Sequence, residues 1–222
     1  MVITVNGVQL YYEKTGEGRP LIMAHCNSMD HKIFRKAVKV LSGHFTVYCP
    51  DTRDHGKSSR VKTLHYEDMA EDMVQFIVAL GLEKPAFYGF SDGGIIGLLI
   101  ASAHPDLLSA LIVSGASLNP DSTKDLPMKF FRLWSHFDRS DKMRIMMREP
   151  DITDDMLKSI RVPTFVTAGE KDVIKPEHTR HIAETVPGAA LKIFPKTGHS
   201  GYIMNSTRIA DYILSVLKGE TP

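Results

Sequence analysis

The chain has 222 residues, of which 43% are hydrophobic and 24% charged, and its formal net charge is +1. These values are typical of one globular domain, and so small a net charge offers no general attraction for nucleic acid or an anionic membrane. No apolar stretch is long enough to span a bilayer, and MVITVNGVQL lacks the basic start and apolar run of a secretion signal. With only two cysteines, Cys26 and Cys49, we expect reduced thiols and a cytoplasmic protein.

The first predicted element is a hairpin, because VITV and VQLYYEK flank Asn6-Gly7, a pair typical of tight turns. After it, short apolar runs alternate with amphipathic segments of helical period. The runs predict strands at 20–26, 45–49, 85–90, 110–114, 164–168 and 190–194. Because polar and apolar residues do not alternate within them, they favour parallel strands covered on both faces.

Helices are predicted between these strands. Apolar residues at helical spacing indicate helices at about 34–41, 69–80 and 209–217, and the wholly apolar 95–101 indicates a buried central helix. A further helix is expected to begin at Pro176 and to end before Pro187. Together the elements predict an α/β fold with an eight-stranded, mostly parallel sheet and helices on both faces.

One interval has no strand pattern. Residues 116–161 are helical in pattern and rich in Met and aromatic residues, so we interpret them as a short helical cap inserted into a core domain of 1–115 and 162–222. A cap must bury an apolar face over the site. Candidates for the substrate pocket are therefore Met128, Phe131, Trp134 and Met146, with simple packing as the alternative.

The residues Gly89-Phe90-Ser91-Asp92-Gly93 match the pattern G-x-S-x-G between a predicted strand and a predicted helix. In that setting the serine sits on a sharp turn with its hydroxyl exposed, and the flanking positions must be small because backbone segments approach closely. A helix-capping serine is the alternative. The strand–motif–helix context favours Ser91 as a nucleophile.

A serine nucleophile needs a base, and the base needs an orienting acid. His199 lies in a glycine-flanked loop after the last predicted strand, and Asp172 follows the strand at 164–168. Glu170 is the competing carboxylate. The order Ser, Asp, His along the chain belongs to the strand–turn–helix arrangement of the nucleophile, and all three follow strand ends. We therefore predict Ser91, His199 and Asp172 as catalytic residues.

An oxyanion hole would complete this set. One backbone N–H is expected from Asp92, directly after the nucleophile, and the other from Asn27 in the loop after the strand at 20–26. His25 is expected to order that loop.

Several motifs together resemble the α/β-hydrolase superfamily over nearly the whole chain: PLIMAHCNSMD, DTRDHGKSS, YGFSDGG, AGEKD and TGHSGY, in that order. The SDGG context is similar to that of small serine esterases and lactonases, including valacyclovir-hydrolase-like and enol-lactonase-like members. The resemblance implies an α/β-hydrolase fold and hydrolysis of an ester-type bond through an acyl-enzyme, without a cofactor.

Two positions depart from the family pattern. Cys26 stands where the family has glycine after histidine, which restricts the backbone that presents Asn27. Asp54 stands where the family has glycine in R-G-H-G, a change that aspartate tolerates because it adopts left-handed conformations more readily than most residues.

The sequence offers no cluster with metal-ligand spacing, and Asp51 replaces the glycine that a phosphate-binding P-loop requires. Cys26 is a weaker nucleophile candidate because no helix follows it directly. We therefore expect a hydrolase for a small, partly apolar ester, lactone or thioester, with no cofactor, metal, nucleic acid or membrane partner. Amidase, C–C hydrolase and perhydrolase chemistry remain open, because they use the same triad. The alternative is a weakly catalytic or non-catalytic protein that binds a small ligand, for which the departure at Cys26 is the only support.

Overall fold

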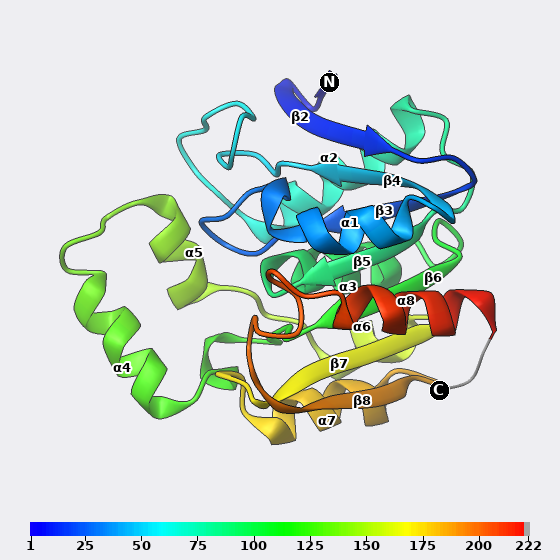
Figure 1. Ribbon diagram of the computed structural model, residues 1–222. Coiled ribbons are helices and arrows are strands. Elements are labelled where there is room, and N and C mark those ends of the chain that lie inside the picture. Colours follow the sequence, from blue (N-terminus) through cyan, green and yellow to red (C-terminus); the bar gives the residue numbers. More distant parts are fainter. Residues whose placement is uncertain (220–222) are drawn as a thin grey trace.

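The computed structural model describes residues 1–219, which form one eight-stranded sheet in the order β1-β2-β4-β3-β5-β6-β7-β8 (Figure 1). The strands are β1 (Val2–Val5), β2 (Val8–Thr15), β3 (Arg19–Ala24), β4 (Phe45–Pro50), β5 (Ala86–Phe90), β6 (Ala110–Ser114), β7 (Thr164–Lys171) and β8 (Ala190–Gly198). Among the strand pairs of this sheet in residues 1–219, only β1–β2 and β2–β4 are antiparallel. The predicted eight-stranded, mostly parallel sheet is confirmed.

The first turn has the geometry that its sequence requires. Asn6 and Gly7 both have positive φ angles, 46° and 75°, and β1 pairs with β2 on either side of them. Two consecutive positive φ angles match the right-handed twist of the flanking strands, which is why Asn-Gly is favoured there.

Helices cover both faces of the sheet, as predicted (Figure 1). One face is covered by η1 (His31–Phe34), α1 (Arg35–Leu41) and α8 (Arg208–Lys218), and the other by α2 (Tyr66–Ala79), α3 (Asp92–Ala103), α6 (Asp154–Ser159) and α7 (Pro176–Thr185). The central α3 is buried along almost its whole length, which explains its apolar sequence. Within residues 1–219 no helix combines the length and apolarity needed to cross a bilayer.

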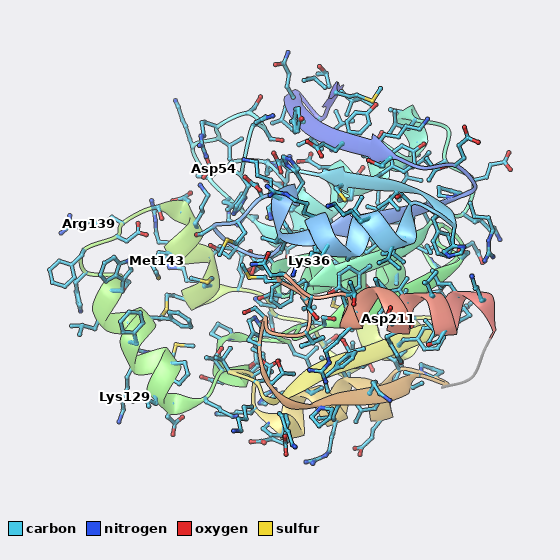
Figure 2. All side chains as sticks on the ribbon, in the orientation of Figure 1. Lys36, Asp54, Lys129, Arg139, Met143 and Asp211 are labelled. Atoms are coloured by element: carbon cyan, nitrogen blue, oxygen red, sulfur yellow. The ribbon has the colours of Figure 1, made fainter. Side chains whose placement is uncertain are left out.

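The segment 116–161 divides into two parts. After η2 (Pro120–Ser122), α4 (Asp125–Trp134) and α5 (Asp141–Arg148) project beyond the sheet (Figure 1), and Figure 2 shows Lys129 and Arg139 on their outer side. The last helix, α6, instead packs beside α3 and α7, because Leu157 is fully buried in the core between helices and sheet. The projecting part is therefore shorter than the predicted insertion.

Candidate active site

Ser91 occupies a strained turn between β5 and α3. Its φ and ψ angles are 54° and −112°, a conformation that non-glycine residues rarely adopt. Its backbone N–H donates to the Ser114 carbonyl at 2.8 Å, while its side chain makes no capping hydrogen bond to α3. The helix-cap interpretation therefore fails, and backbone strain at a half-buried serine that lines a cavity is the arrangement expected of a nucleophile.

The glycines on either side of Ser91 are required by close backbone contacts. A Cβ atom at Gly89 would lie 2.0 Å from the Gly93 carbonyl oxygen, and one at Gly93 would lie 2.1 Å from the Ala24 carbonyl oxygen. Neither partner is a side chain that could move away. The close approach inferred from the sequence motif is thus the reason for both glycines.

His199 and Asp172 meet at the ends of neighbouring strands. The Nδ1 atom of His199, just after β8, lies 2.7 Å from Oδ1 of Asp172, just after β7. Because an ionised carboxylate only accepts hydrogen bonds, Nδ1 carries the proton and Nε2 keeps a free lone pair. The tautomer with the proton on Nδ1 is the one that a general base needs. The Phe90 ring packs against this imidazole with 4.9 Å between centroids.

The carboxylate of Asp172 is held in its charged form. Burial raises its pKa, but the hydrogen bond and charge of His199 and the backbone N–H groups of Ile174 and Gly169 outweigh burial, so that the pKa lies below its usual value. Glu170, the competing acid, instead accepts from the Lys196 N–H at 2.7 Å at the surface. The fold therefore joins His199 to Asp172.

All the predicted site residues except Asp172 line one cavity of about 450 Å³, and Asp172 is joined to it through its contact with His199. Ser91, Asp92, Asn27 and His199 all line it. The four predicted pocket residues do so as well, from α4 and α5: Met128, Phe131, Trp134 and Met146. No hydrogen bond joins Ser91 to His199 within residues 1–219, and such contacts commonly tighten only when substrate binds.

Other lining residues were not predicted from the sequence. They include Tyr66, Ser117, Phe130, Met143 and Glu149. Their common feature is position rather than motif, since the docking of α5 against the start of α2 brings most of them to the cavity. Glu149 makes that contact by accepting from the Tyr66 backbone N–H at 3.1 Å.

The loop that carries Asn27 is held by its own side chains. Asn27 donates from Nδ2 to the Lys142 carbonyl at 3.1 Å and accepts from the Ser28 hydroxyl at 2.7 Å. Cys26 is not among the residues with positive φ in the described chain, so a side chain at that position causes no backbone strain. The structure thus shows no left-handed backbone strain at Cys26 itself.

Asp54 and Cys26 also behave as their chemistry predicts. Asp54 has a φ angle of 63°, the left-handed conformation that the sequence implied. Burial raises the pKa of the Cys26 thiol to about 12, which keeps it protonated and unsuitable as a nucleophile. His25 accepts from the Thr52 N–H at 3.0 Å and bonds the Cys26 carbonyl at 2.8 Å, so it orders this loop.

Asp92 adds an unusual carboxyl group to the cavity. Burial raises its pKa from 3.8 to about 6, and the Tyr66 hydroxyl and Asn27 amide offset only part of that shift. Its buried Oδ2 atom has no hydrogen-bond partner within the described chain. A buried carboxylate in this state is costly unless a ligand brings a hydrogen-bond donor.

We expect Asp92→Asn to stabilise the protein above about pH 6. The unfolded carboxyl ionises near 3.8 and the folded one near 6, so the wild type loses stability as the pH rises through that window. The gain should be about 3 kcal/mol at pH ~8 and fall to well under about 1 kcal/mol at pH ~4, measured by urea unfolding. Asp155→Asn, at a fully solvated carboxylate, is the control. Equal effects at both pH values would contradict this assignment.

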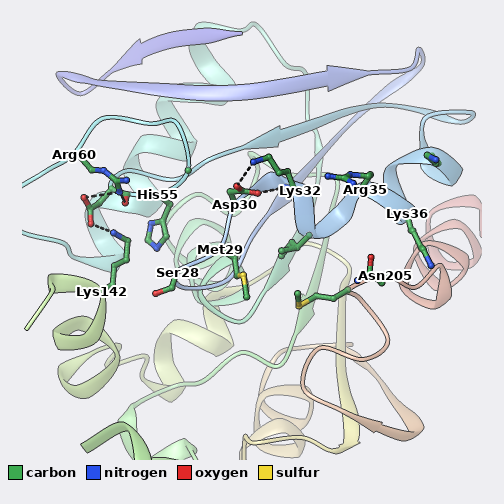
Figure 3. A pocket seen from close by; sticks show the side chains of 15 residues that line it. Ser28, Met29, Asp30, Lys32, Arg35, Lys36, His55, Arg60, Lys142 and Asn205 are labelled. Carbon is green, nitrogen blue, oxygen red and sulfur yellow. Dashed lines mark hydrogen bonds and ion pairs between the residues drawn. The ribbon is translucent and has the colours of Figure 1, made fainter. Parts of the chain in front are cut away.

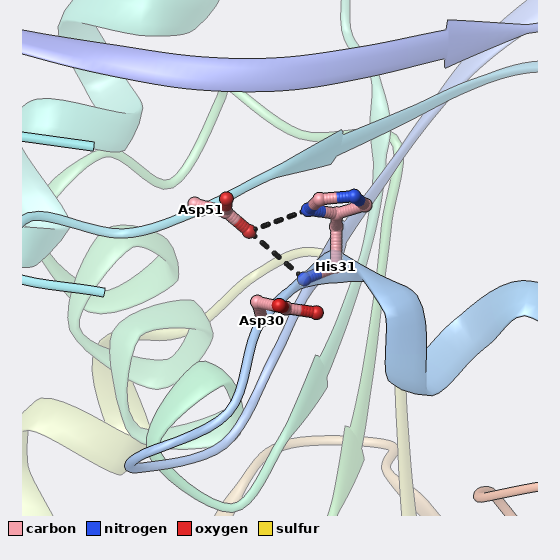
Figure 4. Close-up of side chains that lie close together, drawn as sticks. All are labelled: Asp30, His31 and Asp51. Carbon is pink, nitrogen blue, oxygen red and sulfur yellow. Dashed lines mark hydrogen bonds and ion pairs between the residues drawn. The ribbon is translucent and has the colours of Figure 1, made fainter. Parts of the chain in front are cut away.

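The fold also brings together Asp30, His31 and Asp51, three residues of types that bind metals (Figure 4). The atoms that could bind a metal already have partners within the protein. Asp51 Oδ1 accepts from the His31 backbone at 2.9 Å and lies 2.7 Å from His31 Nδ1, while Oδ2 accepts from the Lys57 N–H at 2.9 Å. His31 Nε2 lies 3.1 Å from Glu13. These contacts give the group a structural role in joining loops.

With this fold and site, the chain belongs to the alpha/beta hydrolase fold family, whose model matches residues 19–142, and the predicted membership is confirmed. It is 28% identical to the serine hydrolase BPHL of Homo sapiens, over 89% of this chain and 79% of that protein. It is 25% identical to the AB hydrolase superfamily protein YisY of Bacillus subtilis, over 95% and 96%. The enol-lactonase from Burkholderia xenovorans LB400 has the same fold, with a TM-score of 0.83 at 20% identity over 98% of this chain and 100% of that one.

Proposed function

We propose that the protein is a serine hydrolase that cleaves a carboxylic ester, lactone or thioester through an acyl-enzyme. The observation that carries this proposal is the 2.7 Å contact between His199 and Asp172 beside a cavity that also holds the strained Ser91. A packing or capping role for these residues would not require a strained serine and an imidazole at one cavity, with an ionised acid hydrogen-bonded to that imidazole.

The proposed reaction uses only side chains and backbone groups of this site. Ser91 Oγ attacks the carbonyl carbon as its proton moves to His199 Nε2, and Asp172 stabilises the resulting imidazolium. The backbone N–H groups of Asn27 and Asp92 bind the oxyanion, and each such donor lowers the barrier by about 3–4 kcal/mol. His199 then protonates the leaving group, and a water activated by the same imidazole releases the acyl group.

The cavity walls suggest the kind of substrate. Met and aromatic side chains from α4 and α5 line one side, which suits a partly apolar acyl group. We therefore propose a small, partly apolar ester-type substrate.

A panel of esters, lactones, thioesters and amides of graded acyl length tests this proposal. We expect turnover of ester-type substrates with a preference set by acyl length, since the cavity of about 450 Å³ limits what fits. Folded protein that turns over no member of the panel would contradict the proposal.

A glycine behind the imidazole gives a further prediction. Gly115 has a φ angle of 58°, and a Cβ atom there would lie 2.7 Å from Cε1 and 2.8 Å from Nδ1 of His199. We expect Gly115→Ala to displace the imidazole and to lower kcat about 100-fold, because misplacement by about 1 Å costs that much. The measurement is steady-state hydrolysis of a 4-nitrophenyl ester, together with thermal unfolding.

Gly81→Ala is the matched control, since Gly81 has a φ angle of 60° and nothing lies within 4 Å of the added Cβ. Both variants should lose about 1–2 kcal/mol from the left-handed backbone, but only Gly115→Ala should lose activity in the folded protein. Equal activity in the two variants would show that His199 is not in the reaction.

A further inference from the structure

A second cavity, of about 800 Å³, shares a lining residue with the catalytic one, and Figure 3 shows the side chains that line it. Its walls come from η1 and α1, the loop around Asp54, the start of α5 and the turn at Asn205. Ser28 lines both cavities, and it directly follows Asn27 in the proposed oxyanion loop. A molecule that reaches Ser91 through the catalytic cavity thus has a neighbouring space at this loop.

The side chains that line this second cavity are mostly positively charged. Six cationic side chains line it, against two anionic ones, although the whole chain has a net charge of only +1. The cations are Lys32, Arg35, Lys36, Lys39, Arg60 and Lys142. Burial lowers the pKa of His55 in the same wall to about 4, so that the imidazole adds no charge near neutral pH.

Half of these cations have no ion-pair partner in the described part of the chain. Lys32 pairs with Asp30 at 3.2 Å, while Arg60 and Lys142 both pair with Asp54. No ion pair within residues 1–219 involves the remaining three, which all lie on α1: Arg35, Lys36 and Lys39. Ala37 and Leu41 of α1 face the core, so the unpaired charges are on its solvent side.

We propose that this basic cavity binds the phosphate-bearing end of an ester or thioester substrate whose carbonyl group lies at Ser91. A concave wall with one sign of charge concentrates the field and attracts an anion more strongly than a flat surface does. Three unpaired cations exceed what one carboxylate would neutralise, whereas a phosphate group carries up to two charges and several acceptor oxygens. The volume suits a small organic phosphate.

Binding of phenyl phosphate to the Ser91→Ala protein tests the cavity independently of catalysis, because the proposed nucleophile is absent. Isothermal titration calorimetry at low salt should show a Kd that increases at least about tenfold in Arg35→Ala/Lys36→Ala and that increases with ionic strength. The control Lys158→Ala/Lys218→Ala removes the same charge outside the cavity, and its Kd should stay within about twofold of the parent. The proposal would be overturned if both double variants lost the same affinity for phenyl phosphate, or if the Ser91→Ala parent did not bind it.

The link to the substrate rests on the proposed function and has its own test. Butyryl-coenzyme A and 4-nitrophenyl butyrate share an acyl group, but only the first has a phosphate-bearing leaving group. In Arg35→Ala/Lys36→Ala, kcat/KM for butyryl-coenzyme A should fall about tenfold more than kcat/KM for 4-nitrophenyl butyrate, mainly because KM for butyryl-coenzyme A rises. Equal falls, or phenyl phosphate binding without any turnover of butyryl-coenzyme A by the wild type, would overturn the substrate role. Loss of all turnover with binding retained would identify the proposed function as the part that failed.

Discussion

Ser91→Ala should lower kcat for 4-nitrophenyl butyrate by on the order of a million-fold, leaving only the rate that binding and the oxyanion donors provide. The variant removes the oxygen that would form the acyl-enzyme and leaves the rest of the cavity in place. Its stability should stay about the same, because alanine keeps the Cβ atom and therefore the backbone strain of this turn. Steady-state kinetics and urea unfolding of the same preparation measure both effects.

Ser117→Ala is the control, because Ser117 lines the same cavity but does not lie on the strained turn. We expect its kcat to stay within about tenfold of the wild type. A Ser91→Ala protein that retains turnover comparable to Ser117→Ala would mean that another group is acylated or that water attacks directly.

Asp172→Asn should lower kcat by on the order of ten thousand-fold. The asparagine side chain fits the same space but can donate an N–H to His199 Nδ1, which favours the opposite tautomer and puts the ring proton on Nε2, where the lone pair is needed. The substitution should also lower stability, because Oδ1 and Oδ2 now accept from Ile174 and Gly169 backbone N–H groups at 3.0 and 3.3 Å. The pH profile of kcat/KM, measured beside kcat, would show the altered base.

Glu170→Gln provides the matched control two residues away. Its carboxylate accepts from the Lys196 N–H at the surface and does not contact His199. We expect near wild-type kcat. If Glu170→Gln lost as much activity as Asp172→Asn, the orienting role would belong to the loop as a whole and not to the Asp172 carboxylate.

The sequence predicts the fold because each strand–helix unit carries its own pattern. Unalternating apolar runs mark buried parallel strands, and Asn6-Gly7 marks the hairpin, whose two positive φ angles the structure shows. The glycines at 89 and 93 are also predictable, because the motif around Ser91 requires backbone segments to approach more closely than a Cβ atom would allow. The contact of His199 with Asp172 follows from topology, because ends of adjacent parallel strands lie at one edge of the sheet.

Features that depend on how helices dock were not predictable. Helix α6 lies within the predicted cap range but joins the core layer, because only the folded chain shows Leu157 buried beside α3. The raised pKa of Asp92 depends on the surroundings that Tyr66 and the projecting helices create. The basic cavity likewise combines α1 with Arg60 and Lys142 from distant segments of the chain. No local sequence motif therefore predicts this cavity.

The most direct test of the central claim is peptide mapping by mass spectrometry after reaction with a fluorophosphonate, which bonds covalently to activated serines. Our account predicts one adduct, on Ser91, that forms rapidly in the wild type and in Ser117→Ala and much more slowly in Asp172→Asn. An adduct on another residue, or none on protein shown to be folded, would contradict the claim that Ser91, His199 and Asp172 act together.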